Sequence, residues 1–379
     1  PGPVLIDITK NAQNEMMEEF EYRKCTQIRT YRAKLELQAD QVSAAAALIN
    51  GAKRPYILAG QGVLLSGASK ELVAFSERTG IPVACTLLGL GCFPTDHPNY
   101  VGYLGMHGNY APNLLTNECD VLIGIGMRFD DRVTGNVSKY AKQARVIHID
   151  IDKAEINKII QSEVHVHADA REALLALQAK CNENKHADWV VHFHQLNAVE
   201  YDKVIHHEFN STGQIKMAEV IHQLTNLTKG EAVVVTDVGQ HQMITSRYYK
   251  MKHPRTHITS GGAGTMGFAL PAAMGASLSV PGQQIVAVIG DGGFQMTVQE
   301  LGTIMQYKIP VKILVLNNSF LGMVRQWQQL FHGKRYSFTE MENPDFVKLA
   351  EAYRITANRV SDRENLQSAL KTMLDAKGP

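Results

Sequence analysis

The chain has 379 residues, 45% of them hydrophobic, which is enough for two or three domains with cores of their own. Lys and Arg number 38 against 37 Asp and Glu, and this balance argues against a nucleic acid partner, which needs a concentrated basic surface. No apolar run reaches the roughly eighteen residues of a membrane span, so no membrane contact is expected. Five scattered cysteines, none in a CxxC pair, suit free thiols in a reducing cytoplasm of the bacterial type.

The N-terminal part of the chain is predicted to be irregular after one short strand. Residues 1–13 are interpreted as the last strand of a domain whose body is absent, centred on Val4–Ile8, and both ends of the sequence look cut. Residues 14–35 are rich in Glu, Arg and Lys and are predicted to form a linker.

Residues 36–180 alternate between apolar strands and helical patterns. Helices are expected at residues 41–52 and 69–79, and strands at residues 55–59, 81–85, 119–126 and 145–152. Continuous apolar strands separated by helices indicate a parallel sheet that is covered on both faces.

A second alternation follows a polar, His-rich stretch at residues 181–212, which is predicted to be a linker. In residues 213–379, strands are expected at residues 232–237, 284–290 and 311–316, and a helix of small residues at residues 267–276. The predicted fold class is therefore α/β, with two doubly wound parallel-sheet domains.

Two motifs at strand ends carry the chemistry. Gly290-Asp291-Gly292-Gly293 follows one apolar strand, and Asn317-Asn318 follows the next, one strand–helix–strand unit later. Because parallel strands end at the same edge of a sheet, we expect Asp291 and Asn318 to lie close together. A carboxylate, an amide oxygen and a backbone carbonyl are ligands for a hard cation such as Mg²⁺, and glycines let the backbone approach a diphosphate. Alone, Gly-Asp-Gly would more simply be a structural turn.

Together, the two motifs resemble the signature of thiamine diphosphate enzymes. The segments that narrow the family are Asp237–Met243, Ser260–Phe268, Leu321–Gln328, Met106–Gly108, Met127–Gly135 and His148–Asp152. In this order they resemble the large catalytic subunits of acetolactate (acetohydroxyacid) synthases, and the resemblance covers nearly the whole chain. It implies that residues 36–180 form a middle, FAD-binding-like domain and residues 213–379 the thiamine diphosphate domain.

The resemblance implies a cofactor site in the second domain. Mg²⁺ would be held by Asp291, Asn318 and the Phe320 carbonyl. Residues expected to contact thiamine diphosphate are Gly239, Gln240, His241, Gly264, Met266, Gly292, Gly293, Met296, Phe320 and Gly322. Met266 matches the apolar residue over which the cofactor bends. Without the motifs, it would be interpreted simply as a packed core residue.

The resemblance also implies the reaction. Members of the family decarboxylate pyruvate and transfer the hydroxyethyl unit to a second 2-ketoacid, pyruvate or 2-ketobutyrate, in branched-chain amino-acid biosynthesis. With Met266, the residues expected to act in catalysis are Arg132, which would bind the second carboxylate, and Trp327, which would help select the larger substrate. The simpler alternatives are a surface ion pair of Arg132 with Asp131, and a packed core indole for Trp327.

The middle domain of biosynthetic members binds FAD. Residues that match its binding pattern are Gly60, Gly62, Thr86, Leu87, Met106, His107, Gly108, Arg128 and Asp150. The GxGxxG fingerprint of dinucleotide sites is absent, so FAD is expected from the resemblance alone.

The resemblance further implies a homodimer or tetramer and a regulatory small subunit. The Glu that activates the cofactor lies, in the family, in the N-terminal domain, so the chain as given is expected to be inactive. Two alternatives stay open. One is a thiamine diphosphate-dependent 2-ketoacid oxidase or decarboxylase, and the other is a non-catalytic cofactor-binding module.

Overall fold

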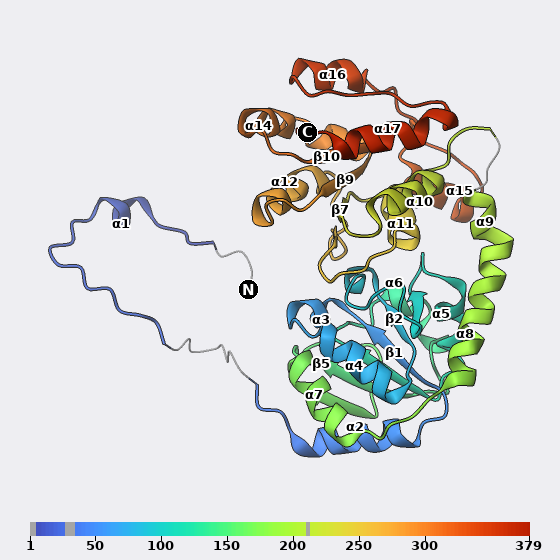
Figure 1. Ribbon diagram of the computed structural model, residues 1–379. Helices are drawn as coiled ribbons and strands as arrows, with labels where there is room; N and C mark the ends of the chain where they lie inside the picture. Colours follow the sequence, from blue (N-terminus) through green and yellow to red (C-terminus); the bar gives the residue numbers. More distant parts are fainter. Residues whose placement is uncertain (1–4, 27–34, 210–212) are drawn as a thin grey trace. The chain divides into compact units, whose positions relative to one another are not determined.

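The computed structural model describes residues 5–26, 35–209 and 213–379, and the chain divides into two units, Pro1–Leu35 and Glu36–Pro379 (Figure 1). In the described part of the first unit, one short helix, α1 (Lys10–Asn14), is followed by exposed, irregular chain. The strand predicted within residues 1–13 is wrong for residues 5–8, which are exposed and pair with no strand. A strand needs a backbone partner for its N–H and C=O groups. Val4 and residues 27–34 of the predicted linker lie outside the described residues.

The first half of the larger unit is a six-stranded, all-parallel sheet with strand order β3-β2-β1-β4-β5-β6. Its strands are β1 (Pro55–Ala59), β2 (Val83–Cys85), β3 (Tyr100–Tyr103), β4 (Val121–Ile125), β5 (Arg145–Asp150) and β6 (Val164–His167). Its helices are α2 (Ala39–Gly51), α3 (Gln61–Leu65), α4 (Ser69–Thr79), α5 (Tyr110–Leu115), α6 (Asp131–Thr134) and α7 (Ala170–Lys180). We call this part the middle domain.

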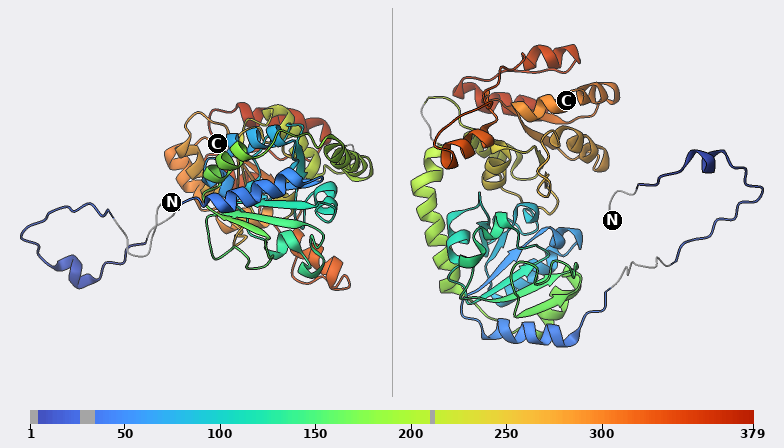
Figure 2. Two further views of the ribbon diagram at one scale, coloured as in Figure 1. Left: turned by 90° about the horizontal axis from the view of Figure 1, so that it is seen from below. Right: turned by 180° about the vertical axis from the view of Figure 1, so that it is seen from behind.

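Alternate residues of the strands enter different cores. Ile57 and Ala59 of β1 pack with buried side chains of α2, α4 and α7, which cover one face. Tyr56 and Leu58 pack on the other face with α5 and with Trp189 and Phe193 of the later helix α8. Figure 2 shows α2 (blue) and α7 (green) together on the first of these faces. The middle domain is therefore doubly wound, as predicted.

The interdomain segment predicted at residues 181–212 is largely helical, which its sequence did not indicate, and residues 210–212 lie outside the described residues. Helix α8 (Ala187–Glu200) continues through a π-helical turn, η3 (Tyr201–Ile205), into α9 (His206–Phe209). Trp189 and Phe193, one helical turn apart, are buried against the middle domain, and the Trp189 indole N–H donates to the Pro55 carbonyl at 2.9 Å. These two aromatic side chains fix the helix on the middle domain, although its other positions mix apolar and polar residues without an amphipathic pattern.

The C-terminal domain is built on a four-stranded parallel sheet with order β10-β9-β7-β8. The strands are β7 (Val233–Thr236), β8 (His257–Thr259), β9 (Ile285–Gly290) and β10 (Lys312–Leu316). The helices are α10 (Met217–Thr228), α11 (Gln240–Tyr248), α12 (Ala269–Ser279), α13 (Asp291–Met296), α14 (Glu300–Tyr307), α15 (Gly322–Phe331), α16 (Phe346–Ala352) and α17 (Arg363–Asp375).

This sheet is also covered on both faces. Val233 and Val235 pack with α12 and α14, whereas Val234 packs with α10 and α17. The two predicted doubly wound domains are thus both present.

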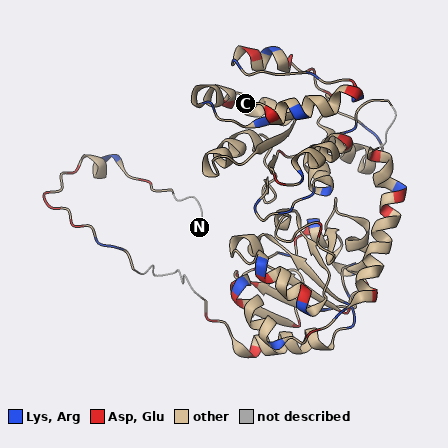
Figure 3. Ribbon diagram, viewed as in Figure 1, with Lys and Arg blue, Asp and Glu red and all other residues tan. Residues whose placement is uncertain are grey.

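Charged residues of both signs are interspersed along the helices of the two domains (Figure 3). Among the described residues, no helix combines the length and the apolar character that crossing a bilayer requires.

Candidate active site

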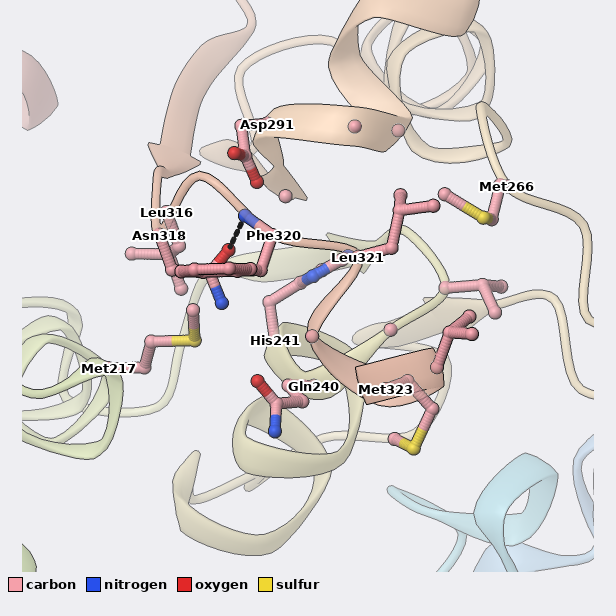
Figure 4. Close-up of a pocket in the computed structure, with 17 residues that line it drawn as sticks. Met217, Gln240, His241, Met266, Asp291, Leu316, Asn318, Phe320, Leu321 and Met323 are labelled. Atoms are coloured by element: carbon pink, nitrogen blue, oxygen red, sulfur yellow. Dashed lines mark hydrogen bonds between the residues drawn. The ribbon is translucent and has the colours of Figure 1, made fainter. Parts of the chain in front are cut away.

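The carboxyl ends of β9 and β10 bring the two predicted metal ligands together. Leu316 of β10 pairs with Gly290 of β9, so the residues that follow both strands leave the sheet at the same level. Asp291 then begins helix α13, and Asn318 lies in the loop before α15. Both line one cleft, shown in Figure 4.

Most of the residues predicted to contact the cofactor also line this cleft. They are Gly239, Gln240, His241, Met266, Gly292, Gly293, Phe320 and Gly322. Two do not: Met296 lies at the end of α13 with 53% of its surface exposed, and Gly264 lies in the loop before α12. The cleft is also lined by residues for which no cofactor contact was predicted, although most of them belong to the motifs named above: Met217, Val238, Gly290, Leu316, Leu321, Met323 and Val324.

Glycines bring the backbone close to polar side chains in this cleft. A Cβ at Gly290 would lie 2.7 Å from the imidazole of His241, and one at Gly239 would lie 2.8 Å from it. A Cβ at Gly322 would lie 2.2 Å from Gln240 Oε1. A side chain at any of these positions would displace its neighbour. The glycines therefore let the backbone itself form the surface of the cleft.

His241 is a neutral, buried imidazole. Burial lowers its pKa to about 4, opposed by a hydrogen bond with the Asp237 backbone, and its Nε2 atom is buried without a hydrogen-bond partner in the described structure. An unpartnered buried nitrogen costs free energy, which a ligand in the cleft would recover by hydrogen bonding.

Acid sensitivity is an expected consequence of two such histidines. Burial also lowers the pKa of His257 to about 4. The unfolded chain binds these protons near pH 6.5, so stability should fall as the pH is lowered from about 6.5 to about 4, by roughly 3 kcal/mol per histidine. The urea midpoint measured between about pH 7.5 and 4.5 checks this. His257→Leu should flatten the profile, and His206→Gln, at an exposed position, should not. Equal slopes in all three proteins would contradict the assignment.

Asp237 holds the loop that carries Met266. Its fully buried carboxylate accepts the Val238 N–H at 2.8 Å and the Gly267 N–H at 2.9 Å. Burial raises the pKa of this carboxyl, and hydrogen bonds from the backbone N–H groups of Val238, Gly267 and Phe268 oppose the rise. Asp237 belongs to the Asp237–Met243 segment, but no role was predicted for it. Its place directly after a buried strand was the available signal.

The metal-ligand candidates are held by hydrogen bonds. Asp291 is 2% exposed, and its Oδ2 accepts from Asn343 Nδ2 at 2.7 Å. Asn318 Oδ1 accepts the Phe320 N–H at 3.1 Å, in a tight turn with Ser319 at φ +58° (Figure 4). Each of these oxygens has a second lone pair for a cation. Among the described residues there is no group of three or more His, Cys, Asp or Glu with metal geometry, and this donor set is of a different kind.

The two residues predicted to face the substrate meet across the domains. The guanidinium carbon of Arg132, in α6, lies 5.9 Å from the ring centroid of Trp327, in α15, within range of a cation–π interaction. Trp327 is 36% exposed and so is not a core indole. The Arg132–Asp131 pair is long, at 4.0 Å, and exposed. The packed core indole is thus excluded for Trp327, whereas the surface pair of Arg132 with Asp131 is present and leaves the guanidinium accessible.

The residues predicted for FAD share the carboxyl edge of the six-stranded sheet. Gly60 and Gly62 follow β1, Thr86 and Leu87 follow β2, Met106, His107 and Gly108 follow β3, Arg128 follows β4, and Asp150 ends β5. The order of the sheet reverses between β1 and β4, where open α/β sheets bind their ligands.

Gly60 and Gly62 are explained by the protein backbone itself. A Cβ at Gly60 would lie 2.3 Å from the Gly126 carbonyl oxygen, and one at Gly62 would lie 2.6 Å from the Gly126 Cα. Gly62 N–H donates to that carbonyl at 2.9 Å. The Gly126 backbone thus approaches both glycines closely, which accounts for the missing side chains.

Known families match both domains. Residues 237–379 match the family described as "Thiamine pyrophosphate enzyme, C-terminal TPP binding domain", and residues 42–177 match "Thiamine pyrophosphate enzyme, central domain". The two parallel-sheet domains are thus the central and C-terminal domains of this class of enzyme.

Individual relatives narrow the class. The chain is 41% identical over 383 residues to the acetolactate synthase isozyme 2 large subunit of Escherichia coli, covering 100% of the chain and 67% of that protein. It is 40% identical to the acetolactate synthase large subunit of Haemophilus influenzae over 383 residues, and 39% identical to the isozyme 3 large subunit of Escherichia coli over 384 residues. These alignments cover 100% and 99% of the chain, and 66% of each relative. The chain belongs to the acetolactate synthase large subunit family.

Proposed function

We propose that the cleft binds thiamine diphosphate through Mg²⁺, and that the protein acts as an acetolactate synthase. It would decarboxylate pyruvate and transfer the resulting two-carbon unit to a second pyruvate or to 2-ketobutyrate. The observation that carries the proposal is the convergence of Asp291 and Asn318 in one glycine-walled cleft. When bound, thiamine diphosphate would supply the electron sink for decarboxylation.

The residues of the cleft fit this group in three ways. Asp291, Asn318 and the Phe320 carbonyl offer oxygen ligands to a hard cation. The glycines at positions 239 and 290 allow a ligand to approach the backbone closely. The unpartnered Nε2 of His241 offers a hydrogen bond to that ligand. We assign Gln240, Gly292, Gly293 and Gly322 to the diphosphate side, and half-buried Met266 to the apolar support of the cofactor.

Arg132 and Trp327 are proposed to receive the second 2-ketoacid. A guanidinium binds a carboxylate through two parallel hydrogen bonds, and the neighbouring indole limits the space for the alkyl group. Both side chains are accessible and lie together although they come from different domains.

FAD and the partners of the protein are proposals of the same kind. The carboxyl edge of the middle sheet offers Arg128, which pairs with Asp130 at 3.1 Å, and half-buried Asp150 to a dinucleotide. The relatives are named large subunits and are longer than this chain. We therefore propose a regulatory small subunit, assembly as a homodimer or tetramer, and a cytoplasmic location.

Calorimetric titration of the chain with thiamine diphosphate tests the proposal. Binding should be detectable with Mg²⁺ and lost when EDTA removes the metal, because the diphosphate would meet an anionic Asp291 without the cation between them. Met305→Ala, at an exposed position of α14 outside the cleft, should bind as the unmodified chain does. No heat of binding at millimolar cofactor with Mg²⁺ present would contradict the assignment of the cleft.

A further inference from the structure

The Asn343 side chain forms hydrogen bonds with three residues of the candidate metal site. It lies in the irregular segment between α15 and α16, and its Nδ2 donates to Asp291 Oδ2 at 2.7 Å and to Asn317 Oδ1 at 3.0 Å. Its Oδ1 accepts from Gln295 Nε2 at 2.9 Å. Gln295 and Asp291 belong to α13, and Asn317 to the loop that carries Asn318. All the hydrogen-bonding atoms of the Asn343 side chain are thus engaged at this site.

The chemistry of these partners requires an amide at position 343. The carboxylate of Asp291 only accepts hydrogen bonds, so the group that faces it must donate. Turning the Asn343 amide over would place its oxygen against two acceptors, Asp291 Oδ2 and Asn317 Oδ1. A carboxylate at position 343 would repel Asp291, and an apolar side chain would leave the buried Oδ2 without its donor.

We propose that Asn343 is a positioning residue for the metal, which orients the Asp291 carboxylate and locks the loop of Asn318 to helix α13. This inference rests on the proposed function of the cleft. With Oδ2 held by Asn343, the Asp291 carboxylate is fixed in one orientation for the cation. The two ligands follow neighbouring strands, and Asn343 is the cross-link that fixes their separation beyond the ends of those strands.

Mn²⁺ titrated into the chain with excess thiamine diphosphate, followed by electron paramagnetic resonance, measures metal affinity directly. Loss of an outer partner of a metal ligand typically weakens metal binding by about 10–100-fold, and we expect a decrease in this range for Asn343→Leu. Gln295→Leu removes the donor to Asn343 and a longer hydrogen bond, 3.4 Å, from Gln295 Nε2 to the Asp291 backbone carbonyl, and should weaken binding less. Asn365→Leu, on exposed helix surface, is the matched control and should leave the affinity unchanged. Melting temperatures without ligand are measured for all variants.

The outcomes separate the inference from the function on which it rests. If the unmodified chain takes up no Mn²⁺ with thiamine diphosphate, the proposed function fails and the role of Asn343 fails with it. If that chain binds Mn²⁺ and Asn343→Leu binds it equally well, only the positioning role is overturned, even where the melting temperature falls. Should Asn343→Leu not fold, Gln295→Leu decides: weaker Mn²⁺ binding at an unchanged melting temperature supports the role, and unchanged binding overturns it.

Discussion

Asp291→Ala is expected to abolish the Mg²⁺-dependent binding of thiamine diphosphate, with a loss of affinity on the order of 100-fold or more. Asp291 is the one acidic side chain among the residues that line the cleft, where the neighbouring polar groups are neutral or backbone. Without it, the cation would have only amide and carbonyl oxygens from the protein and would lose its one direct charge partner there. Titration calorimetry of the variant at saturating Mg²⁺ measures the change.

A variant that removes only the charge of Asp291 makes this test more specific. Asp291→Asn keeps the shape of the side chain and an oxygen for the Asn343 amide, but removes the negative charge. It should weaken cofactor binding nearly as much as Asp291→Ala while melting close to the unmodified chain. Unchanged affinity in both variants would show that Asp291 does not hold the metal.

The buried strands of both sheets could be predicted because they are continuous apolar runs. Strand β1 agrees with its predicted residues, 55–59, and β9 and β10 begin within one residue of theirs. The three strands that were missed, β3, β6 and β8, all lie at sheet edges. Such strands have one neighbour instead of two, are short, and carry polar residues such as His165 and His167, so they lack the apolar pattern.

Helix α8 was missed for a different reason. Its buried side chains, Trp189, Phe193 and Glu200, form a narrow stripe, and one of them is charged. The exposed remainder mixes apolar residues, such as Val191 and Val199, with polar ones, so no apolar helical period stands out in the sequence. What orders this segment is packing against the middle domain, which no local pattern can show.

In the site, too, some residues could be predicted from local sequence, whereas others are placed only by tertiary packing. Asp291 and Asn318 were brought together by a rule about parallel strands, which needs only the strand ends. Asn343 reaches Asp291 through an irregular segment, and Met217 enters the cleft from α10. Neither has a periodic or spacing signal. Gly60 and Gly62 were named from the family resemblance, but only the structure shows Gly126 as their neighbour.

The largest expected loss of stability comes from Arg247→Ala. Arg247 of α11 pairs with Glu200 of α8, whose side chain is 5% exposed, and also reaches the Gly108 carbonyl at 3.4 Å. Asn109 Nδ2 donates to the second Glu200 oxygen at 3.1 Å. Removing the guanidinium leaves a buried carboxylate without its counter-charge, which typically costs about 3–5 kcal/mol. Urea unfolding followed by the fluorescence of Trp189 and Trp327 measures the loss in both domains.

Two comparisons decide whether the buried charge is the cause. Arg359→Ala breaks an exposed pair with Asp345, 65% and 41% exposed, and should cost at most about 1 kcal/mol. The double variant Glu200→Leu with Arg247→Leu removes both charges and should recover much of the loss, because apolar residues often replace a buried ion pair without penalty. If the double variant is as unstable as Arg247→Ala, the packing of the arginine stem matters more than the charge. Glu200 and Arg247 also join α8 and the loop of His107 and Gly108 to α11. Because the first residues of α11 line the cleft, loss of this ion pair should also weaken cofactor binding.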